Sequence, residues 1–409
     1  MKTNNNKPII RFPDFDQDWK YINLNEVLTK QSIRNNTYNY KEVFSVSKDK
    51  GVINQLEHLG RSYASSDLHN YKVVFPNNLV YTKSPTAGFP FGIIKQNRLN
   101  RAGVVSVLYG VFKSNSKEMS NLLDIYFSSQ LNTYNYLVPL VHKGAKNTMN
   151  ICDETFLSGY KIGVPQDIEE QKKIVSFFEE IDKRIDQLLK KKALLSQYRK
   201  GIMQKLFNKQ LTFKDQGNKS FPKWETYPIN KILKRYSVPV LVEPNKLYTQ
   251  IGIRSHGKGI FHKEPVIGKT LGKKRVFWVR EDKLILNIVF AWERAISRTT
   301  IKENGKIASH RFPMYEPVNN LIDLDYIFYY FLTPKGKYYL QLASPGGAGR
   351  NKTLGQNEFE KLKITIPSLK EQVKISKFIK DLDKKISLID SEISQTKMFK
   401  RGLLQKMFI

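Results

Sequence analysis

Cysteine is almost absent from this chain. Cys152 is the only one among 409 residues. A single cysteine excludes an internal disulfide and a cluster of thiolate metal ligands. We interpret Cys152 as a small buried hydrophobic residue, which is the usual role of a free cysteine.

Long apolar segments are also missing, and we expect no N-terminal leader. No run of about 18 apolar residues occurs, and residues 1–6 are polar, unlike a signal peptide. We therefore expect no membrane span and a cytoplasmic location. Hydrophobic residues still make up 40% of the chain, enough to build globular cores. At about 150 residues per domain, the length favours two to three domains.

Acidic residues are scarce relative to basic ones. The chain has 37 Asp and Glu but 68 Lys and Arg, which gives a formal net charge of +31 at pH 7. A surplus of this size predicts a polyanionic partner. Because membrane signals are missing, nucleic acid is the favoured partner.

Motifs for catalysis are incomplete. Segment 252–259 nearly matches a phosphate-binding loop, but Gly259 stands where a Ser or Thr must bind Mg²⁺. No Pro-Pro dipeptide occurs, which excludes the Asn/Asp-Pro-Pro-aromatic motif of amino-methyltransferases. The six histidines show no paired-ligand spacing on a helix. We predict a chain with no catalytic residue, no metal site and no cofactor of its own.

What the sequence does contain is a long internal repeat. Residues 171–207 match residues 372–408 at a constant offset of 201, which aligns Asp182 with Asp383. A repeat period this long is far beyond that of a solenoid. It predicts two similar halves, each a globular unit followed by a helix.

Both repeated segments follow a proline and carry a heptad seam. Apolar residues recur in steps of four and three, which keeps one stripe of a helix facing a partner helix. Polar residues at Lys192, Arg199, Thr396 and Lys400 interrupt the seam and would fix its register. We predict that the two helices pack on each other; the alternative is two amphipathic helices, each packed on its own domain. The seam positions are Ile174, Phe178, Ile181, Ile185, Leu188, Leu195, Ile202 and Leu206, and then Ile375, Ile379, Leu382, Ile386, Ile389, Ile393, Leu403 and Met407.

The duplication continues more weakly outside the helices. Arg11-Phe-Pro with Trp19 opens the first half, and Ser220-Phe-Pro with Trp224 opens the second. The interiors diverge, but each holds short strand-like runs and one aromatic, helix-like stretch. We predict an α+β fold for each half. The strand-like runs are 72–75, 79–81, 104–109, 275–279 and 284–286, the helical stretches are 121–127 and 324–332, and 208–219 is a polar linker.

Basic residues gather in the predicted loops beside Gly, Ser, Thr and Asn. Such positions suit phosphate contacts, while Arg and Asn can also read base edges. For any one of them alone, a solvated surface charge is the simpler interpretation. The candidate DNA-binding residues are Lys48, Lys83, Lys143, Lys146, Asn147, Arg254, Ser255, His256, Lys258, Lys273, Lys274, Arg275, Arg294, Arg298, Arg350, Asn351 and Lys352.

Together these features resemble the specificity subunit of a Type I restriction–modification system. The resemblance is carried by the Glu170-Gln171 and Glu371-Gln372 junctions after proline and by the Phe-Pro…Trp openings. The matched Gly-x-x-Gln-Lys-x-Phe helix ends and the segment 251–259 agree as well. The likeness covers essentially the full chain.

The resemblance implies a domain plan. Two similar α/β target-recognition domains would each be followed by a conserved spacer helix, and the two helices would pair as an antiparallel coiled coil. The boundaries would be 1–165 for the first domain, 166–210 for its helix, 211–367 for the second domain and 368–409 for its helix.

The resemblance also implies a function. Each recognition domain would read one half of a split target in double-stranded DNA, and the helices would dock two methyltransferase subunits. Restriction subunits with translocase and nuclease activity would join them. S-adenosylmethionine, ATP and Mg²⁺ would then be bound by partner subunits. The resemblance identifies no single base-reading residue.

Two other functions stay open. A single-chain restriction–methylation enzyme is disfavoured by the missing catalytic motifs. A non-specific nucleic-acid-binding protein would fit the charge, but it would not need two divergent domains held by a spacer.

Overall fold

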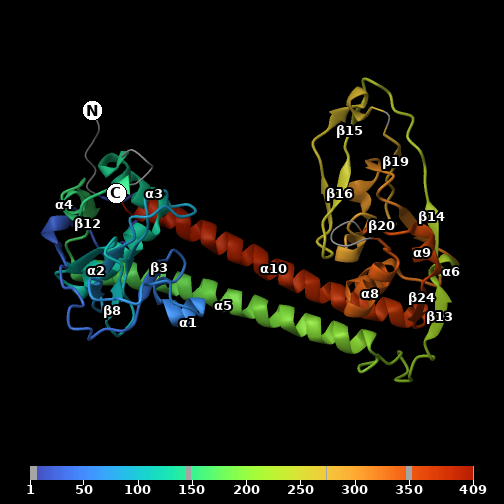
Figure 1. Ribbon diagram of the computed structural model, residues 1–409, viewed down its shortest axis with the longest axis horizontal. Coiled ribbons are helices and arrows are strands. Elements are labelled where there is room, and N and C mark those ends of the chain that lie inside the picture. Colours follow the sequence, from blue (N-terminus) through green and yellow to red (C-terminus); the bar gives the residue numbers. More distant parts are fainter. Residues whose placement is uncertain (1–6, 144–148, 273, 347–351, 409) are drawn as a thin grey trace. The chain divides into compact units, whose positions relative to one another are not determined.

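The computed structural model describes residues 7–143, 149–272, 274–346 and 352–408, and of residues 142–150 at most the backbone. The chain forms two compact units. Unit 1 contains Met1–Lys190 and Ser391–Ile409, and unit 2 contains Lys191–Asp390. The helices α5 (Ile168–Phe207) and α10 (Leu369–Met407), green and red in Figure 1, each contribute residues to both units.

Unit 1 is an α+β fold, as predicted for the first half. Its strands are β1 (Lys20–Ile22), β2 (Leu28–Lys30), β3 (Phe44–Ser47), β4 (Gly51–Asn54), β5 (Lys72–Val74), β6 (Leu79–Tyr81), β7 (Ile94–Gln96), β8 (Gly103–Val105), β9 (Gly110–Ser114), β10 (His142–Lys143), β11 (Met149–Asn150) and β12 (Ile162–Val164). Its shorter helices are α1 (Gln55–Leu59), α2 (Lys117–Ser128), α3 (Gln130–Leu137) and α4 (Asp153–Leu157). The predicted helical stretch 121–127 lies inside α2.

Unit 2 is also α+β. Its strands are β13 (Glu225–Pro228), β14 (Leu233–Tyr236), β15 (Leu247–Tyr248), β16 (Ile251–Ile253), β17 (Ile260–His262), β18 (Val266–Ile267), β19 (Val276–Trp278), β20 (Leu284–Leu286), β21 (Ile296–Arg298), β22 (Ile307–Ser309), β23 (Met314–Pro317) and β24 (Lys363–Ile366). Its shorter helices are α6 (Ile229–Ile232), α7 (Leu324–Leu332), α8 (Pro334–Leu342) and α9 (Gln356–Lys361).

The interiors of the two units share one topology although their sequences diverge. Unit 1 has a four-stranded sheet in the order β2-β9-β6-β7, and unit 2 has the same arrangement as β14-β23-β20-β21. Three antiparallel strand pairs also correspond: β1–β12 with β13–β24, β3–β4 with β16–β17, and β5–β8 with β19–β22. The duplication therefore includes the whole unit and not only its ends.

The far end of each long helix enters a hydrophobic core. In unit 1, the Phe408 ring at the end of α10 lies 6.1 Å from Trp19 and 5.5 Å from Tyr126, measured between centroids. In unit 2, the Phe207 ring at the end of α5 lies 5.2 Å from Tyr326. Phe207 and Phe408 are equivalent in the repeat, so the matched Gly-x-x-Gln-Lys-x-Phe endings serve to complete the cores.

Within each unit, α5 and α10 run antiparallel. In unit 1, Lys400 Nζ lies 2.6 Å from Asp182 Oδ1. In unit 2, Arg199 Nη2 donates to Asp383 Oδ2 at 3.0 Å. These two ion pairs are equivalent under the repeat offset, so two of the polar residues that interrupt the seam meet an acidic residue of the facing helix.

The seam positions lie on the inner side of the helices. Each of the sixteen is buried or half-buried. Ile174, Phe178 and Leu188 are at most 2% exposed in unit 1, as are Ile375 and Ile379 in unit 2. An apolar stripe protected along both helices is what heptad spacing produces.

The Glu-Gln junctions fix how each helix leaves its preceding strand. The Gln171 side-chain amide donates to the Pro165 carbonyl at 2.9 Å, and Gln372 donates to the Pro367 carbonyl at 2.8 Å. Both glutamines are buried. A buried amide that satisfies the carbonyl of the preceding proline holds the turn into the helix in one conformation.

The glutamates that precede these glutamines, Glu170 and Glu371, have different partners in the two units. In unit 1, Glu170 accepts from Arg11 at 2.7 Å and from the Trp19 indole at 3.2 Å. In unit 2, Trp224 still donates to Glu371, but Ser220 replaces the arginine. Glu371 is 2% exposed, and its Oε2 has no hydrogen-bond partner among the described residues. Burial raises the pKa of Glu371, although Trp224 and Lys209 oppose the rise.

Two expectations from the sequence are wrong. Cys152 is exposed rather than buried, because it caps the N-terminus of α4, where its Sγ accepts from the Thr155 amide at 3.3 Å. The strand expected at 104–109 ends at Val105, and a turn that exposes Val107 and Leu108 follows. No helix among the described residues is long and apolar enough to span a membrane.

The buried Glu371 side chain gives a pH prediction. Because its pKa is raised in the folded state, Glu371 contributes stability at pH values below its unfolded pKa, and this contribution is lost as the pH rises through the folded pKa. Glu371→Gln should therefore raise the free energy of unfolding relative to wild type at pH 7, with a smaller difference near pH 4. Urea unfolding across this range measures it.

Glu170→Gln is the matched control in unit 1. It breaks a buried ion pair and should lower stability at pH 7 by about 3 kcal/mol. Two results would contradict a raised pKa of Glu371. One is an equal change in the free energy of unfolding for both variants, and the other is a Glu371→Gln change that does not depend on pH.

Candidate nucleic-acid interface

A tight turn between β16 and β17 presents three predicted residues to solvent. Arg254, His256 and Lys258 are all exposed. The turn is closed by a hydrogen bond from the Arg254 amide to the Gly259 carbonyl at 3.0 Å. Gly257 has a φ of +66°, and a Cβ there would lie 2.5 Å from the Leu332 side chain. Glycine at this position therefore lets the turn lie close against the end of α7.

The turn is fastened to a second loop that follows β20. The His256 amide donates to the Glu293 carbonyl at 2.9 Å, and the Gly257 amide donates to the Arg294 carbonyl at 2.9 Å. The Ser255 hydroxyl donates to the Glu293 carboxylate, also at 2.9 Å. Ser255 thus positions the turn, while its basic neighbours point outward.

Aromatic rings lie beneath some of these cations. The Arg254 guanidinium is 4.9 Å from the centroid of the Phe261 ring, and Lys352 Nζ is 6.0 Å from that of Trp292. Cation–π contacts hold a charged group in place without neutralising it. The positive charge thus stays available to an anion.

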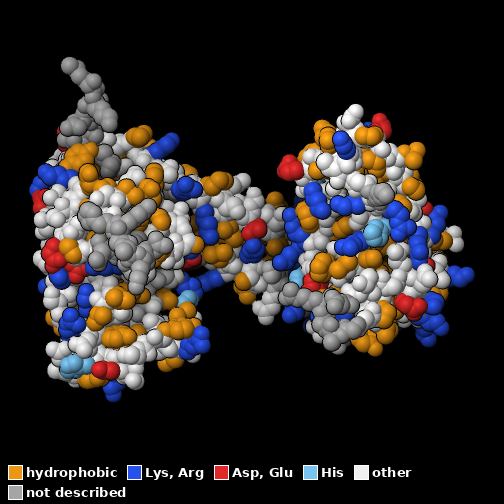
Figure 2. All heavy atoms as spheres, turned by 45° about the horizontal axis from the view of Figure 1, so that its top comes forward, with side chains coloured by type: hydrophobic (Ala, Val, Ile, Leu, Met, Phe, Trp, Pro, Cys, Tyr) orange, Lys and Arg blue, Asp and Glu red, His pale blue; other side chains and the backbone are white. Residues whose placement is uncertain are grey.

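Further cations lie on loops joined to the same region. Lys274, Arg275, His310 and Arg311 are exposed, and the His310 amide donates to the Arg275 carbonyl at 3.2 Å. The Ile288 amide donates to the Arg311 carbonyl, and the Leu354 amide donates to the Ile288 carbonyl. Figure 2 shows Lys and Arg side chains gathered with a histidine on one face of unit 2. We call this set of loops, 254–259, 274–275, 290–294, 310–311 and 352, the basic face of unit 2.

Three predicted residues are engaged inside the protein instead. Lys83 Nζ lies 2.7 Å from Asp153 Oδ1. Arg294 Nη1 donates to the Leu332 carbonyl at 3.0 Å. Arg298 bridges Asp282, at 2.7 Å, and Asp325. These side chains hold the fold together and are not positioned as free phosphate ligands.

The Lys83 contact belongs to a compact charge cluster in unit 1. Lys30 and Lys72 lie 3.5 and 3.7 Å from Asp153 Oδ2. Burial alone would raise the pKa of Asp153, but the three ammonium groups outweigh it and lower that pKa. The cluster joins α4 to the strands β2 and β5, which is a structural role.

The remaining predicted residues are divided between unit 1 and undescribed segments. Lys48 is exposed in the turn between β3 and β4, the counterpart of the β16–β17 turn. For Lys143, in β10, only the backbone is described. Lys146, Asn147, Lys273, Arg350 and Asn351 lie outside the described residues.

Sequence reasoning did not select His310 and Arg311. They directly follow β22, and the backbone contacts of the fold bring them to the basic face. Among the described residues, no group of three His, Cys, Asp or Glu side chains is placed to hold a metal ion. The arrangement of exposed cations and aromatic rings suits the binding of phosphate groups.

The fold defines a class of duplicated α+β proteins. Two long helices each contribute residues to both units, and they run antiparallel within each unit. The chain matches the family of Type I restriction modification DNA specificity domains over residues 16–196 and 265–397. The protein belongs to this family, and the resemblance drawn from its sequence is confirmed. Its curated relatives are named as specificity subunits.

Two curated relatives come from Methanocaldococcus jannaschii. The protein named as the MjaX specificity subunit of a type I restriction enzyme is 23% identical over 286 residues, which cover 67% of this chain and 63% of the relative. The type I restriction enzyme MjaVIII specificity subunit is 24% identical over 220 residues, covering 51% and 47%. The chain thus spans less than two thirds of the length of these relatives.

Two solved structures share the fold at 14% identity. The S subunit of a Type I system from M. genitalium aligns over 98% of this chain and 99% of its own, with a TM-score of 0.54. A chain from a structure of a type I R-M system, described in terms of complex assembly and conformational transition, aligns over 95% and 97% with a TM-score of 0.56.

The basic face can be tested directly. Arg254→Ala combined with Lys258→Ala should weaken duplex DNA binding by about tenfold, or ~1.4 kcal/mol, because two exposed cations are removed. Fluorescence anisotropy with a labelled duplex at fixed salt measures this.

The matched control is Lys231→Ala combined with Lys363→Ala. Both are exposed lysines of unit 2, on α6 and β24. This pair removes the same charge and should leave affinity nearly unchanged. Equal losses for both pairs would show that only net charge matters.

Proposed function

We propose that this chain is the sequence-specific DNA-binding subunit of a Type I restriction–modification system and recognises a bipartite target. The observation that carries the proposal is the duplication of an entire recognition unit with one topology and unlike surface loops. Equivalent folds with different loops can read different base sequences, since base contacts come from loop side chains and not from the scaffold. Unit 1 would read one half-site and unit 2 the other.

The long helices would act as the spacer. Antiparallel contacts are present within each unit, and we propose that they continue as one coiled coil along α5 and α10. A helix rises ~1.5 Å per residue, so such a pair would set a fixed separation between half-sites.

The helices would also be the scaffold for partners. Tyr198 on α5 is 51% exposed and Phe399 on α10 is 58% exposed, and the two are equivalent in the repeat. Leu194 and Met398, beside them, are 67% and 66% exposed. Exposed apolar residues gathered on a helix mark interaction sites. Because the patch occurs once per unit, we propose that it docks two copies of one partner, the methyltransferase subunit.

The catalytic chemistry would reside in the partners. Restriction subunits with translocase and nuclease activity would join the methyltransferase core, and S-adenosylmethionine, ATP and Mg²⁺ would be bound there. This chain by itself would have no catalytic activity and would work in the cytoplasm with double-stranded DNA. A single-chain restriction–methylation enzyme is disfavoured because the sequence lacks methyl-donor and nuclease motifs.

The docking proposal predicts stoichiometry. Tyr198→Ser and Phe399→Ser should each yield complexes with one methyltransferase subunit, and the double variant should bind none, because each removes one apolar contact. Native mass spectrometry of reconstituted complexes counts the subunits. Lys385→Ser, at an exposed polar position of α10, is the control and should retain both copies.

The bipartite proposal predicts modular specificity. Replacing residues 213–367 with the matching segment of a relative should change one half of the methylated sequence and leave the other half unaltered. Methylome sequencing of cells that carry each chain with its methyltransferase reads both halves at once. A swap that alters both half-sites would overturn independent recognition by the two units.

A further inference from the structure

Unit 1 contains an open groove that lies against the long helices. Its volume is about 970 Å³. Its lining includes Lys48 and Lys50 of the β3–β4 turn and Lys397 and Arg401 of α10. The groove therefore joins the β3–β4 turn of unit 1 to the long helix α10.

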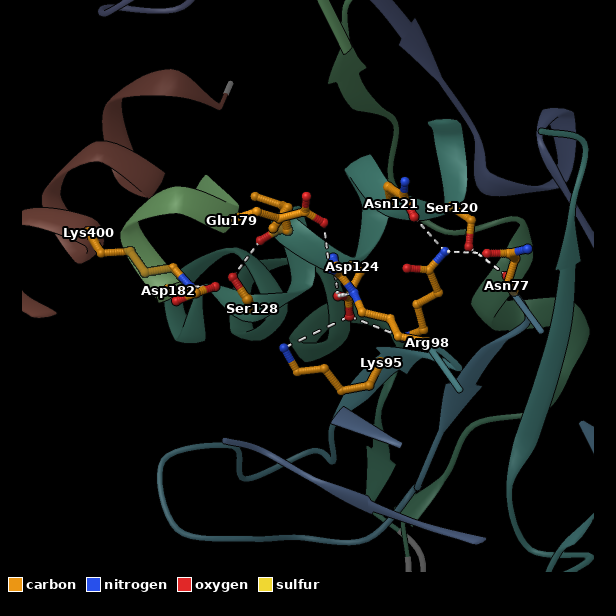
Figure 3. A network of polar contacts seen from close by, with 12 residues as sticks. Asn77, Lys95, Arg98, Ser120, Asn121, Asp124, Ser128, Glu179, Asp182 and Lys400 are labelled. Atoms are coloured by element: carbon orange, nitrogen blue, oxygen red, sulfur yellow. Dashed lines mark hydrogen bonds and ion pairs between the residues drawn. The ribbon is translucent and has the colours of Figure 1, made fainter. Parts of the chain in front are cut away.

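Several lining residues of the groove belong to a network of paired charges (Figure 3). Arg98 donates to Asp124 at 3.0 Å and to Glu179 on α5 at 2.6 Å. Lys95 lies 3.9 Å from Asp124, and Lys400 pairs with Asp182. These cations are already paired with carboxylates, so their role is to hold α2 and α5 in place.

The lining cations of the β3–β4 turn and of α10 are a different group. Lys48, Lys50, Lys397 and Arg401 are exposed and form no ion pair with another described residue. The unpaired acidic residues of the lining are Asp49 and Asp186. The groove thus has an excess of positive charge, carried on both elements by long side chains that reach into solvent.

We propose that this groove binds the sugar–phosphate backbone of duplex DNA, so that α10 contributes phosphate contacts as well as spacing. The inference rests on the proposed function and adds a site to it. Lys397 and Arg401 are four residues apart and lie ~6 Å apart along the helix, about the axial rise of two nucleotides of one strand. Exposed cations from two separate elements of an open groove suit an extended polyanion, whereas a small-molecule site is mostly enclosed and apolar with few convergent polar groups.

The test uses the full chain and a duplex of random sequence. Lys397→Ala combined with Arg401→Ala should reduce the slope of log K against log salt concentration by about 1.8, or about 0.9 per lost phosphate contact. Affinity should fall by the same factor for target and non-target duplexes, because phosphate contacts do not depend on sequence. An unchanged melting temperature shows that the variant folds.

The matched control is Lys377→Ala combined with Lys384→Ala. These are exposed lysines of the same helix that do not line the groove. They remove the same charge and should leave the slope unaltered. An unchanged slope in the groove variant, or an equal change in the control, overturns the proposal.

Two further measurements separate related outcomes. ATP is added as a free polyphosphate; if it binds wild type but not the groove variant while the DNA slope is unaffected, the groove is a nucleotide pocket and the proposal fails. If the wild-type chain shows no preference for any target sequence with its methyltransferase, the proposed function fails, whereas the groove result stands on the salt slope alone.

Discussion

The pairing of α5 with α10 is the constraint on which both units depend. Neither unit completes its core from a single stretch of chain. Phe408, at the end of α10, packs against Trp19 and Tyr126 in unit 1, and Phe207, at the end of α5, packs against Tyr326 in unit 2. Each helix begins in the core of one unit and ends in the core of the other, so both helices contribute to the packing of both units.

The two halves of the repeat have equivalent contacts between the long helices but different contacts elsewhere. Asp182–Lys400 and Arg199–Asp383 are equivalent ion pairs, one in each unit. The buried glutamates break this symmetry, since Arg11 pairs with Glu170 whereas Oε2 of Glu371 has no hydrogen-bond partner among the described residues. Removing one partner of a buried charge pair lowers stability. We infer that the burial of Glu371 lowers the stability of unit 2, whereas Arg11 offsets the burial of Glu170 in unit 1. The loop sequences of the two units also differ, as the proposed recognition of two different half-sites requires.

Charge on this protein divides into two kinds that composition cannot separate. Lys83, Arg298 and Lys400 are paired with carboxylates and hold elements together. Arg254 and Lys352 lie against aromatic rings with their charge unneutralised. Only the second kind can contribute counterion release when a polyanion binds.

The sequence by itself determined the duplication, the heptad seams and the α+β class. Helical periodicity and repeat identity can be read from the order of the residues without knowledge of the fold. It also placed the helices to within a few residues of α5 and α10. It did not determine which basic residues face solvent: Lys83 and Arg294 turn inward, and His310 joins the basic face through a backbone contact to Arg275. Tertiary structure decided these points, since ion pairing and exposure depend on residues far apart in sequence. The shared topology of the two interiors was likewise visible only in the fold, because strand pairing can persist after the side chains that once resembled each other have diverged.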